Sequence, residues 1–120
     1  ELDLPSMRRA MSYLIGERDF TSFRSTSCQS KTSLRNIYSM KIKKKGELIL
    51  IDITANAFLL NMVRIIVGTL LEVGRKKISS KKVKSILDAK DRKLAGKTAS
   101  PEGLYFVGTR YQEKFKLPPA

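Results

Sequence analysis

Apolar positions near the start of the chain recur at helical spacing. Met7, Ala10 and Leu14 would lie on one face of a helix. This spacing predicts an amphipathic helix over residues 5–15, and Gly16 follows it as a stop signal.

The pattern then changes from helical spacing to alternation. Residues 19–24 predict a short helical turn, and the Ser- and Thr-rich stretch 25–33 predicts a loop. Residues 34–45 alternate between apolar and polar side chains, and residues 48–55 are rich in β-branched side chains. Two such runs joined by a tight turn predict a β-hairpin.

The second half of the chain predicts two helices, an irregular basic connection, one strand and a tail. These elements cover 59–73, 80–89, 90–103, 104–111 and 114–120. Neighbouring strands combined with helices indicate an α+β fold, with an antiparallel sheet and helices packed on one of its faces. The length of 120 residues is that of a single domain.

The predicted helix 59–73 is apolar around most of its circumference, which is typical of a buried helix. Asn61, Arg64, Gly68 and Glu72 follow one another at spacings of three, four and four residues. Side chains at these spacings lie on one narrow stripe of a helix.

Arg64 is the cation on this stripe. A guanidinium group stays charged, so its burial requires a carboxylate or phosphate partner. One interpretation is an internal ion pair with Glu72 or Asp52. The other is a cleft in which an acidic catalytic group or a phosphate faces Arg64. Gly68, one turn along, would let another backbone or a ligand approach closely.

The charge of the chain bears on its binding partner rather than on its fold. The chain carries 24 Lys and Arg against 11 Asp and Glu, a formal net charge of +13. Residues 1–60 hold 10 basic and 6 acidic side chains, and residues 61–120 hold 14 and 5. A field of this size favours a polyanion such as nucleic acid.

The composition also excludes several classes of protein. With no His and one Cys, the chain cannot build a zinc site of His and Cys ligands, a Ser-His-Asp triad or a Cys-His pair. The single Cys28 allows no internal disulfide and gives no sign of an oxidising compartment, so a cytoplasmic location is expected. No apolar run approaches the roughly 18 residues that a bilayer requires.

Several motifs together resemble one family. The pattern Phe-x-x-x-Met-Val-Arg-x-Ile-Val-Gly stands at Phe58–Gly68, and Glu-Gly-Leu-Tyr stands at Glu102–Tyr105. Asp19–Arg24 and Leu71–Gly74 add to the match, which runs from about residue 4 to 111. The chain resembles the C-terminal domain of the TruA-type tRNA pseudouridine synthases.

The resemblance implies an isomerase that converts uridine to pseudouridine in the anticodon stem-loop of tRNA, without cofactor or metal, as a homodimer. Its nucleophile is an Asp in an Arg-Thr-Asp-x-Gly motif of the N-terminal half, and this chain contains no such motif. The nucleophile-bearing half is therefore expected outside this chain, which alone should be inactive. Arg64 matches the arginine that pairs with that Asp, Leu104 matches a leucine of the cleft wall, and Asn61 is a further candidate on the same stripe.

Two basic groups are candidates for RNA binding. Arg24, Lys31 and Arg35 flank the polar loop, either as phosphate contacts or as part of a solvated loop. Arg75–Lys77 forms a dense basic run between the two predicted helices. Two alternatives remain: a stand-alone basic RNA-binding module without catalysis, and a protein-interaction domain whose apolar surface a missing half would cover.

Overall fold

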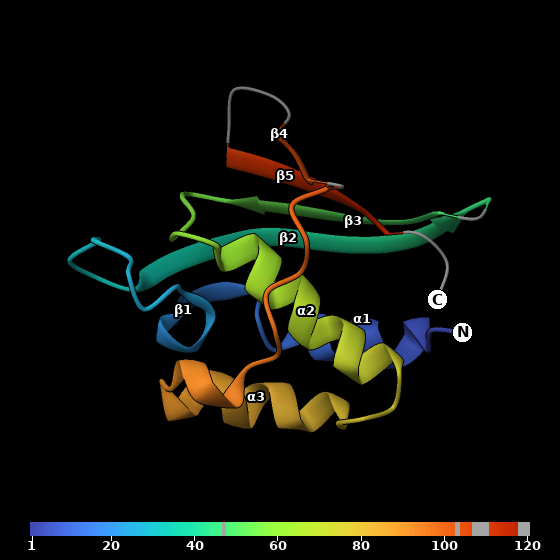
Figure 1. Cartoon of the computed structure of the whole chain (residues 1–120), viewed down its shortest axis with the longest axis horizontal. Helices are drawn as coiled ribbons and strands as arrows, with labels where there is room; N and C mark the ends of the chain where they lie inside the picture. Colours follow the sequence, from blue (N-terminus) through green and yellow to red (C-terminus); the bar gives the residue numbers. More distant parts are fainter. Residues whose placement is uncertain (47, 103, 107–110, 118–120) are drawn as a thin grey trace.

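The computed structural model describes residues 1–46, 48–102, 104–106 and 111–117, with side chains up to residue 102. A twisted sheet lies on one side of the molecule and the helices lie on the other (Figure 1). In chain order the elements are α1 (Leu4–Ser12), β1 (Gly16–Asp19), the 3-10 turn η1 (Thr21–Phe23), β2 (Leu34–Lys45), β3 (Leu48–Ala55), α2 (Met62–Gly74), α3 (Ser80–Ala89), the 3-10 turn η2 (Arg92–Leu94), β4 (Leu104–Phe106) and β5 (Tyr111–Leu117).

The sheet has five strands in the order β1-β2-β3-β5-β4, and every neighbouring pair is antiparallel. The predicted hairpin is confirmed as β2 and β3. Its register shifts between Ile37 and Ser39, where an irregularity interrupts the pairing. The α+β class with helices on one face is therefore confirmed.

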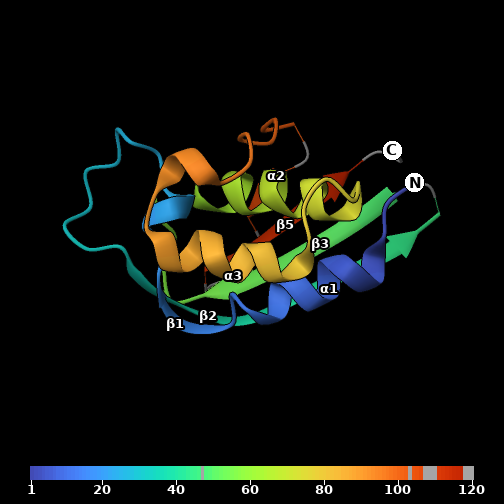
Figure 2. The ribbon, with the colours of Figure 1, turned by 90° about the horizontal axis from the view of Figure 1, so that it is seen from below.

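The helices form two layers on the sheet. Helices α1 and α2 contact each other, and α1 also contacts β2. Helix α3 packs on α1 and η1, and seen from below it covers the side away from the sheet (Figure 2). Side chains from these layers and from the sheet make one core, in which Met7, Phe20, Ile51, Ile53 and Ile66 are fully buried.

Helix α1 is shorter than predicted. Asp3 caps its start by accepting hydrogen bonds from the backbone N–H and the hydroxyl of Ser6. At the other end, the N–H of Tyr13 bonds to the carbonyl of Ala10, which tightens the last turn and ends the helix at Ser12.

Helix α2 begins at Met62, so the predicted start at residue 59 is wrong. Asn61 adopts the left-handed conformation with φ of 60°, which an α-helix cannot continue through. Residues 59–61 therefore form a turn in front of the helix. This turn sets the side chain of Asn61 beside the first helical turn.

Two edges of the sheet also differ from the prediction. Strand β1 has three charged residues out of four and shows no apolar alternation, so only its pairing with β2 reveals it. The single strand predicted over 104–111 is wrong: β4 and β5 form a second hairpin, and β5 occupies much of the predicted tail.

Candidate functional site

Arg64 lies in the first turn of α2, where two neutral oxygens hold its guanidinium group. Its Nε–H donates to the carbonyl of Ala99 at 2.7 Å, and Nη1 donates to Oδ1 of Asn61 at 3.2 Å. The side chain is partly buried. The structure thus brings together two of the three predicted catalytic candidates, Arg64 and Asn61.

The predicted stripe on α2 is covered by another part of the chain. The extended segment Gly96–Ala99, which we call the strap, runs along α2 on its way to β4 (Figure 1). A Cβ atom on Gly68 would lie 1.7 Å from the carbonyl oxygen of Lys97. The prediction that Gly68 admits a close backbone is therefore confirmed, and that backbone is the strap.

Gly96 allows the same close approach from the strap side. A Cβ atom there would lie 2.9 Å from Cα of Thr69 and 2.8 Å from Oε2 of Glu72. Instead, the N–H of Gly96 donates to Oγ1 of Thr69 at 2.9 Å. Thr69 is 1% exposed, and its hydroxyl donates in turn to the carbonyl of Ile65.

Arg92 holds the strap from the other side. Its Nη1 donates to the carbonyl of Gly96 at 3.0 Å, and its Nη2 donates to Oγ1 of Thr98 at 3.2 Å. Sequence reasoning singled out neither Arg92 nor Thr69. Arg92 stood in a stretch interpreted only as basic and irregular, and Thr69 is a single hydroxyl within an apolar helix.

The structure does not contain the internal ion pair that was one interpretation of Arg64. Within the described side chains, no carboxylate lies within 4.0 Å of its guanidinium group. Glu72 lies beside Gly96, and Asp52 lies on β3 opposite Lys41. The charge of Arg64 is thus hydrogen-bonded but is not neutralised by an acid of the described residues.

Arg24 and Arg35 organise the polar loop over residues 25–33. Arg24 donates from Nη1 to the hydroxyl of Ser33 at 2.6 Å and from Nη2 to the carbonyls of Cys28 and Ser30, both at 2.9 Å. Arg35 donates from Nη1 to the carbonyl of Thr32 and to that of Leu34. Both arginines therefore bind the protein's own backbone.

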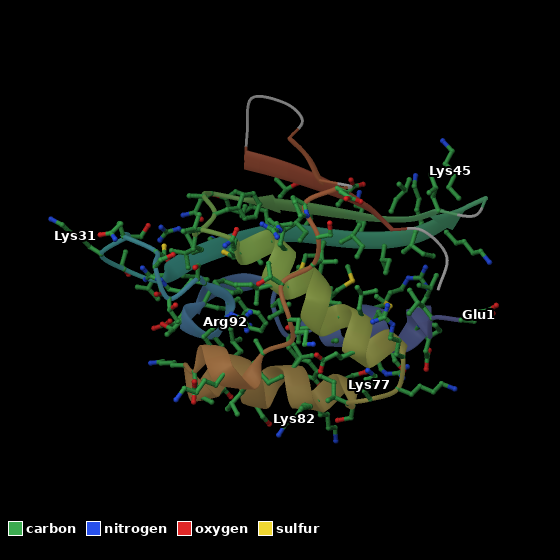
Figure 3. All side chains as sticks on the ribbon, in the orientation of Figure 1. Glu1, Lys31, Lys45, Lys77, Lys82 and Arg92 are labelled. Atoms are coloured by element: carbon green, nitrogen blue, oxygen red, sulfur yellow. The ribbon has the colours of Figure 1, made fainter. Side chains whose placement is uncertain are left out.

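The third loop candidate, Lys31, is exposed and points away from the molecule at the loop's end (Figure 3). The same loop carries the thiol of Cys28. Hydrogen bonds from the backbones of Ser30 and Leu60 lower its pKa to about 7, and the nearby Arg24 adds to this shift. The loop therefore presents an exposed cation and a thiol of lowered pKa, and Arg24 holds its backbone in place.

Arg75–Lys77 forms the turn between α2 and α3, and all three residues are exposed. Lys76 has a φ of 63°, which lets the chain leave α2 sharply. Lys77 and Lys31 lie far apart in the plane of Figure 3, with α2 between them. The two predicted RNA-binding groups are thus separate surfaces.

Leu104 lies in β4 opposite Phe115, and its side chain lies outside the described residues. The structure therefore gives the place of this candidate in the sheet, and its role as a cleft wall stays a prediction.

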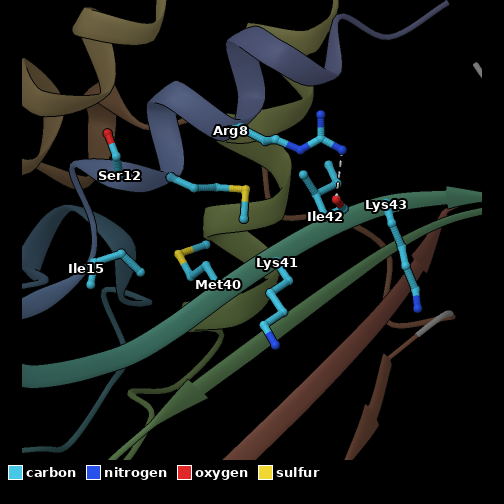
Figure 4. A pocket seen from close by; sticks show the side chains of 8 residues that line it. Arg8, Ser12, Ile15, Met40, Lys41, Ile42 and Lys43 are labelled. Carbon is cyan, nitrogen blue, oxygen red and sulfur yellow. Dashed lines mark hydrogen bonds between the residues drawn. The ribbon is translucent and has the colours of Figure 1, made fainter.

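An open groove lies between α1 and β2, and its described lining includes none of the predicted site residues. Arg8 reaches across it and donates to the carbonyl of Ile42 at 3.2 Å (Figure 4). Its floor is apolar, with Met11, Ile15 and Met40, and the described lining contains no carboxylate. Nothing in this groove suggests chemistry.

The described part of the chain contains no group of three or more His, Cys, Asp and Glu side chains that could hold a metal ion. Within the same residues, none of the helices combines the length and the apolar character that crossing a bilayer demands.

Comparison with known proteins shows which family the chain is related to. The family described as tRNA pseudouridine synthase matches residues 10–112. Proteins named tRNA pseudouridine synthase A from Aliivibrio salmonicida and Vibrio campbellii are each 51% identical to this chain, over 117 and 118 residues. The protein of that name from Shewanella sp. is 47% identical over 118 residues. In each case the match covers 98% of this chain and 45% of the relative, so the chain spans about half the length of these relatives. The chain belongs to the tRNA pseudouridine synthase family.

Proposed function

We propose that this chain is the part of a tRNA pseudouridine synthase that supplies an arginine to an active site completed by the rest of the protein. The observation that carries the proposal is the state of Arg64, whose charge has no carboxylate partner among the described side chains. The sequence lacks the Arg-Thr-Asp-x-Gly motif of the family's nucleophile. The remaining length of the relatives supplies room for that half.

Arg64 would act on the nucleophilic carboxylate of the other half. A guanidinium group lowers the pKa of a neighbouring carboxylate and fixes its orientation through two parallel hydrogen bonds. The isomerisation breaks the bond from C1′ of the ribose to N1 of uracil and forms one from C1′ to C5. The proton lost from C5 is balanced by one gained at N1, so the reaction consumes no cofactor. An ionised, oriented carboxylate is what such a step requires.

The tRNA would be held by phosphate contacts from basic side chains. Lys31 and the turn Arg75–Lys77 are exposed and have no acidic partner among the described residues. Arg24 and Arg35 would contribute by shaping the loop that carries Lys31. We further propose that the longer protein is a homodimer located in the cytoplasm. Sedimentation of the full-length protein would test the dimer.

Substitution of Arg64 in the full-length synthase tests the proposal. Arg64→Ala should lower kcat for pseudouridine formation by at least about a hundredfold, as expected for loss of a preorganised charge. The Kd for tRNA should stay within about threefold, because the basic surfaces are untouched. Arg18→Ala is the matched control, since it removes an exposed arginine from β1.

Normal turnover by Arg64→Ala would overturn the assignment of Arg64. Turnover by the isolated 120-residue chain would overturn the assignment of the nucleophile to the other half. Binding of tRNA by the chain, together with the absence of synthase activity in the longer protein, would instead favour a non-catalytic RNA-binding module.

A further inference from the structure

We propose that the strap Gly96–Ala99 is a positioning element that fixes the orientation of the Arg64 guanidinium group. The inference rests on the proposed function of Arg64 and adds the residues that act through it. These residues are Ala99, which holds Arg64, and Gly68, Thr69 and Arg92, which hold the strap.

The strap is joined to Arg64 at two points. The carbonyl of Ala99 accepts from Nε of Arg64 at 2.7 Å, and the N–H of Ala99 donates to the backbone carbonyl of Arg64 at 2.9 Å. Side chain and main chain of the same residue are therefore tied to one peptide segment. Asn61 adds a third contact through Nη1.

These contacts determine which edge of the guanidinium group remains available. Arginine can pair with a carboxylate through Nε and one terminal nitrogen, or through both terminal nitrogens. Because Ala99 occupies the Nε–H, the first arrangement is closed to Arg64. The terminal edge remains: Nη2 has no hydrogen bond within the described residues, and Nη1, which donates one N–H to Asn61, keeps a second N–H. A carboxylate from another part of the protein would therefore bind at the Nη1–Nη2 edge.

The strap can hold Arg64 only because both glycines admit it. At Gly68 the helix and the carbonyl of Lys97 are too close for any side chain, and at Gly96 the same is true beside Thr69. The hydrogen bonds of Gly96 with Thr69 and with Arg92 then fix the strap laterally. Gly68, Gly96, Thr69 and Arg92 thus hold the strap in place, a role that helix formation alone does not require.

Two variants of the full-length synthase displace the strap without touching Arg64. Gly68→Ala places a methyl group against the Lys97 carbonyl, yet alanine favours the helix itself. Arg92→Ala removes the two hydrogen bonds that the Arg92 side chain donates to the strap. Lys93→Ala is its matched control, because it removes an equal charge from an exposed neighbouring residue. Displacement of a catalytic group by about 1 Å costs on the order of a hundredfold in rate.

We expect Gly68→Ala to lower kcat about a hundredfold and Arg92→Ala about tenfold, with Kd for tRNA within about threefold. Lys93→Ala should leave kcat unchanged. If Gly68→Ala does not fold, Arg92→Ala decides alone. Normal kcat in the variants that fold would overturn the inference.

A double-mutant cycle separates positioning from support of the fold. In an Arg64→Lys background the strap variants should cause no further loss of the single-turnover rate, because the planar group they orient is gone. Full multiplication of the losses would overturn the inference.

If Arg64→Lys shows no turnover, solvent exchange of the Arg64 Nε–H replaces the cycle: faster exchange in Arg92→Ala but not in Lys93→Ala supports the strap, and unchanged exchange overturns it. A wild-type kcat in Arg64→Lys overturns the proposed function itself, whereas a low value beside normal strap variants overturns the strap alone.

Discussion

The main chain of Ala99 forms hydrogen bonds with both the side chain and the main chain of Arg64. One runs from Nε of Arg64 to the Ala99 carbonyl at 2.7 Å, and the other from the Ala99 N–H to the Arg64 carbonyl at 2.9 Å. Two residues 35 positions apart in the sequence are thus joined by two hydrogen bonds at the stripe of α2. The contribution of the hydrogen bonds that hold the strap in place can be measured directly.

Thr69→Val should lower the free energy of unfolding by about 1–3 kcal/mol, because the buried N–H of Gly96 would lose its acceptor. Thr69→Ser keeps the hydroxyl and loses one methyl group, which costs about 1 kcal/mol. Urea denaturation of the three proteins gives the comparison. A smaller loss for valine than for serine would show that the bond to the strap contributes nothing.

Ser22→Ala should also destabilise the fold by about 1–3 kcal/mol. The fully buried hydroxyl of Ser22 donates to the carbonyl of Ile86 at 2.6 Å and accepts from the N–H of Asp91 at 2.8 Å. It therefore joins η1 to the end of α3 and the start of η2. Ser27→Ala, in the exposed loop, should change stability by less than about 0.5 kcal/mol. Equal melting temperatures for the two variants would contradict this role.

Alkylation of Cys28 should report its lowered pKa. The thiolate is the reactive form, and the pKa of this thiol falls from 9.0 to about 7. The rate with iodoacetamide should therefore reach half its maximum near pH 7 in the folded chain and near pH 9 in urea. Arg24→Gln should move the folded midpoint upward, because the loop loses both a frame and a positive charge. A folded midpoint near pH 9 would refute the prediction.

Replacing the basic turn Arg75–Lys77 with glutamine should weaken tRNA binding and make it less dependent on salt. Each lost phosphate contact lowers the slope of log K against log salt by about 0.7–0.9, so three contacts predict a change of about 2–3. The matched control is the same replacement at Lys43–Lys45, which removes an equal charge at the end of the β2–β3 hairpin. Equal slope changes in both variants would show that the turn carries no special contact.

Local patterns predicted the central part of the fold well. The bounds of β2 and β3 follow the predicted 34–45 and 48–55, because the alternation there matches a sheet with one covered face. Helix α3 follows the predicted 80–89, and Ser79 caps it by accepting from the N–H of Lys82. In these elements the local signal and the tertiary packing agree.

The candidate site was predictable only in part. Arg64, Asn61 and Gly68 were found because their residue types and spacing are visible within the single predicted helix over 59–73. Ala99 takes part through its main chain alone, so no property of its side chain could have indicated the contact. Strand β1 escaped prediction for a related reason, since pairing with β2 rather than its own charged sequence makes it a strand.

The position of β5 has a consequence for synthesis on the ribosome. Strand β3 pairs with β2 on one side and with β5 on the other, and β5 comes last among the described strands. One flank of β3 therefore has open hydrogen-bonding groups from the time the first hairpin emerges until β5 emerges. An open flank of this kind is a template for pairing with other chains. Nascent copies of this chain should accordingly be most prone to aggregate before β5 has left the ribosome, and truncation ahead of Tyr111 should convert that brief exposure into a permanent one.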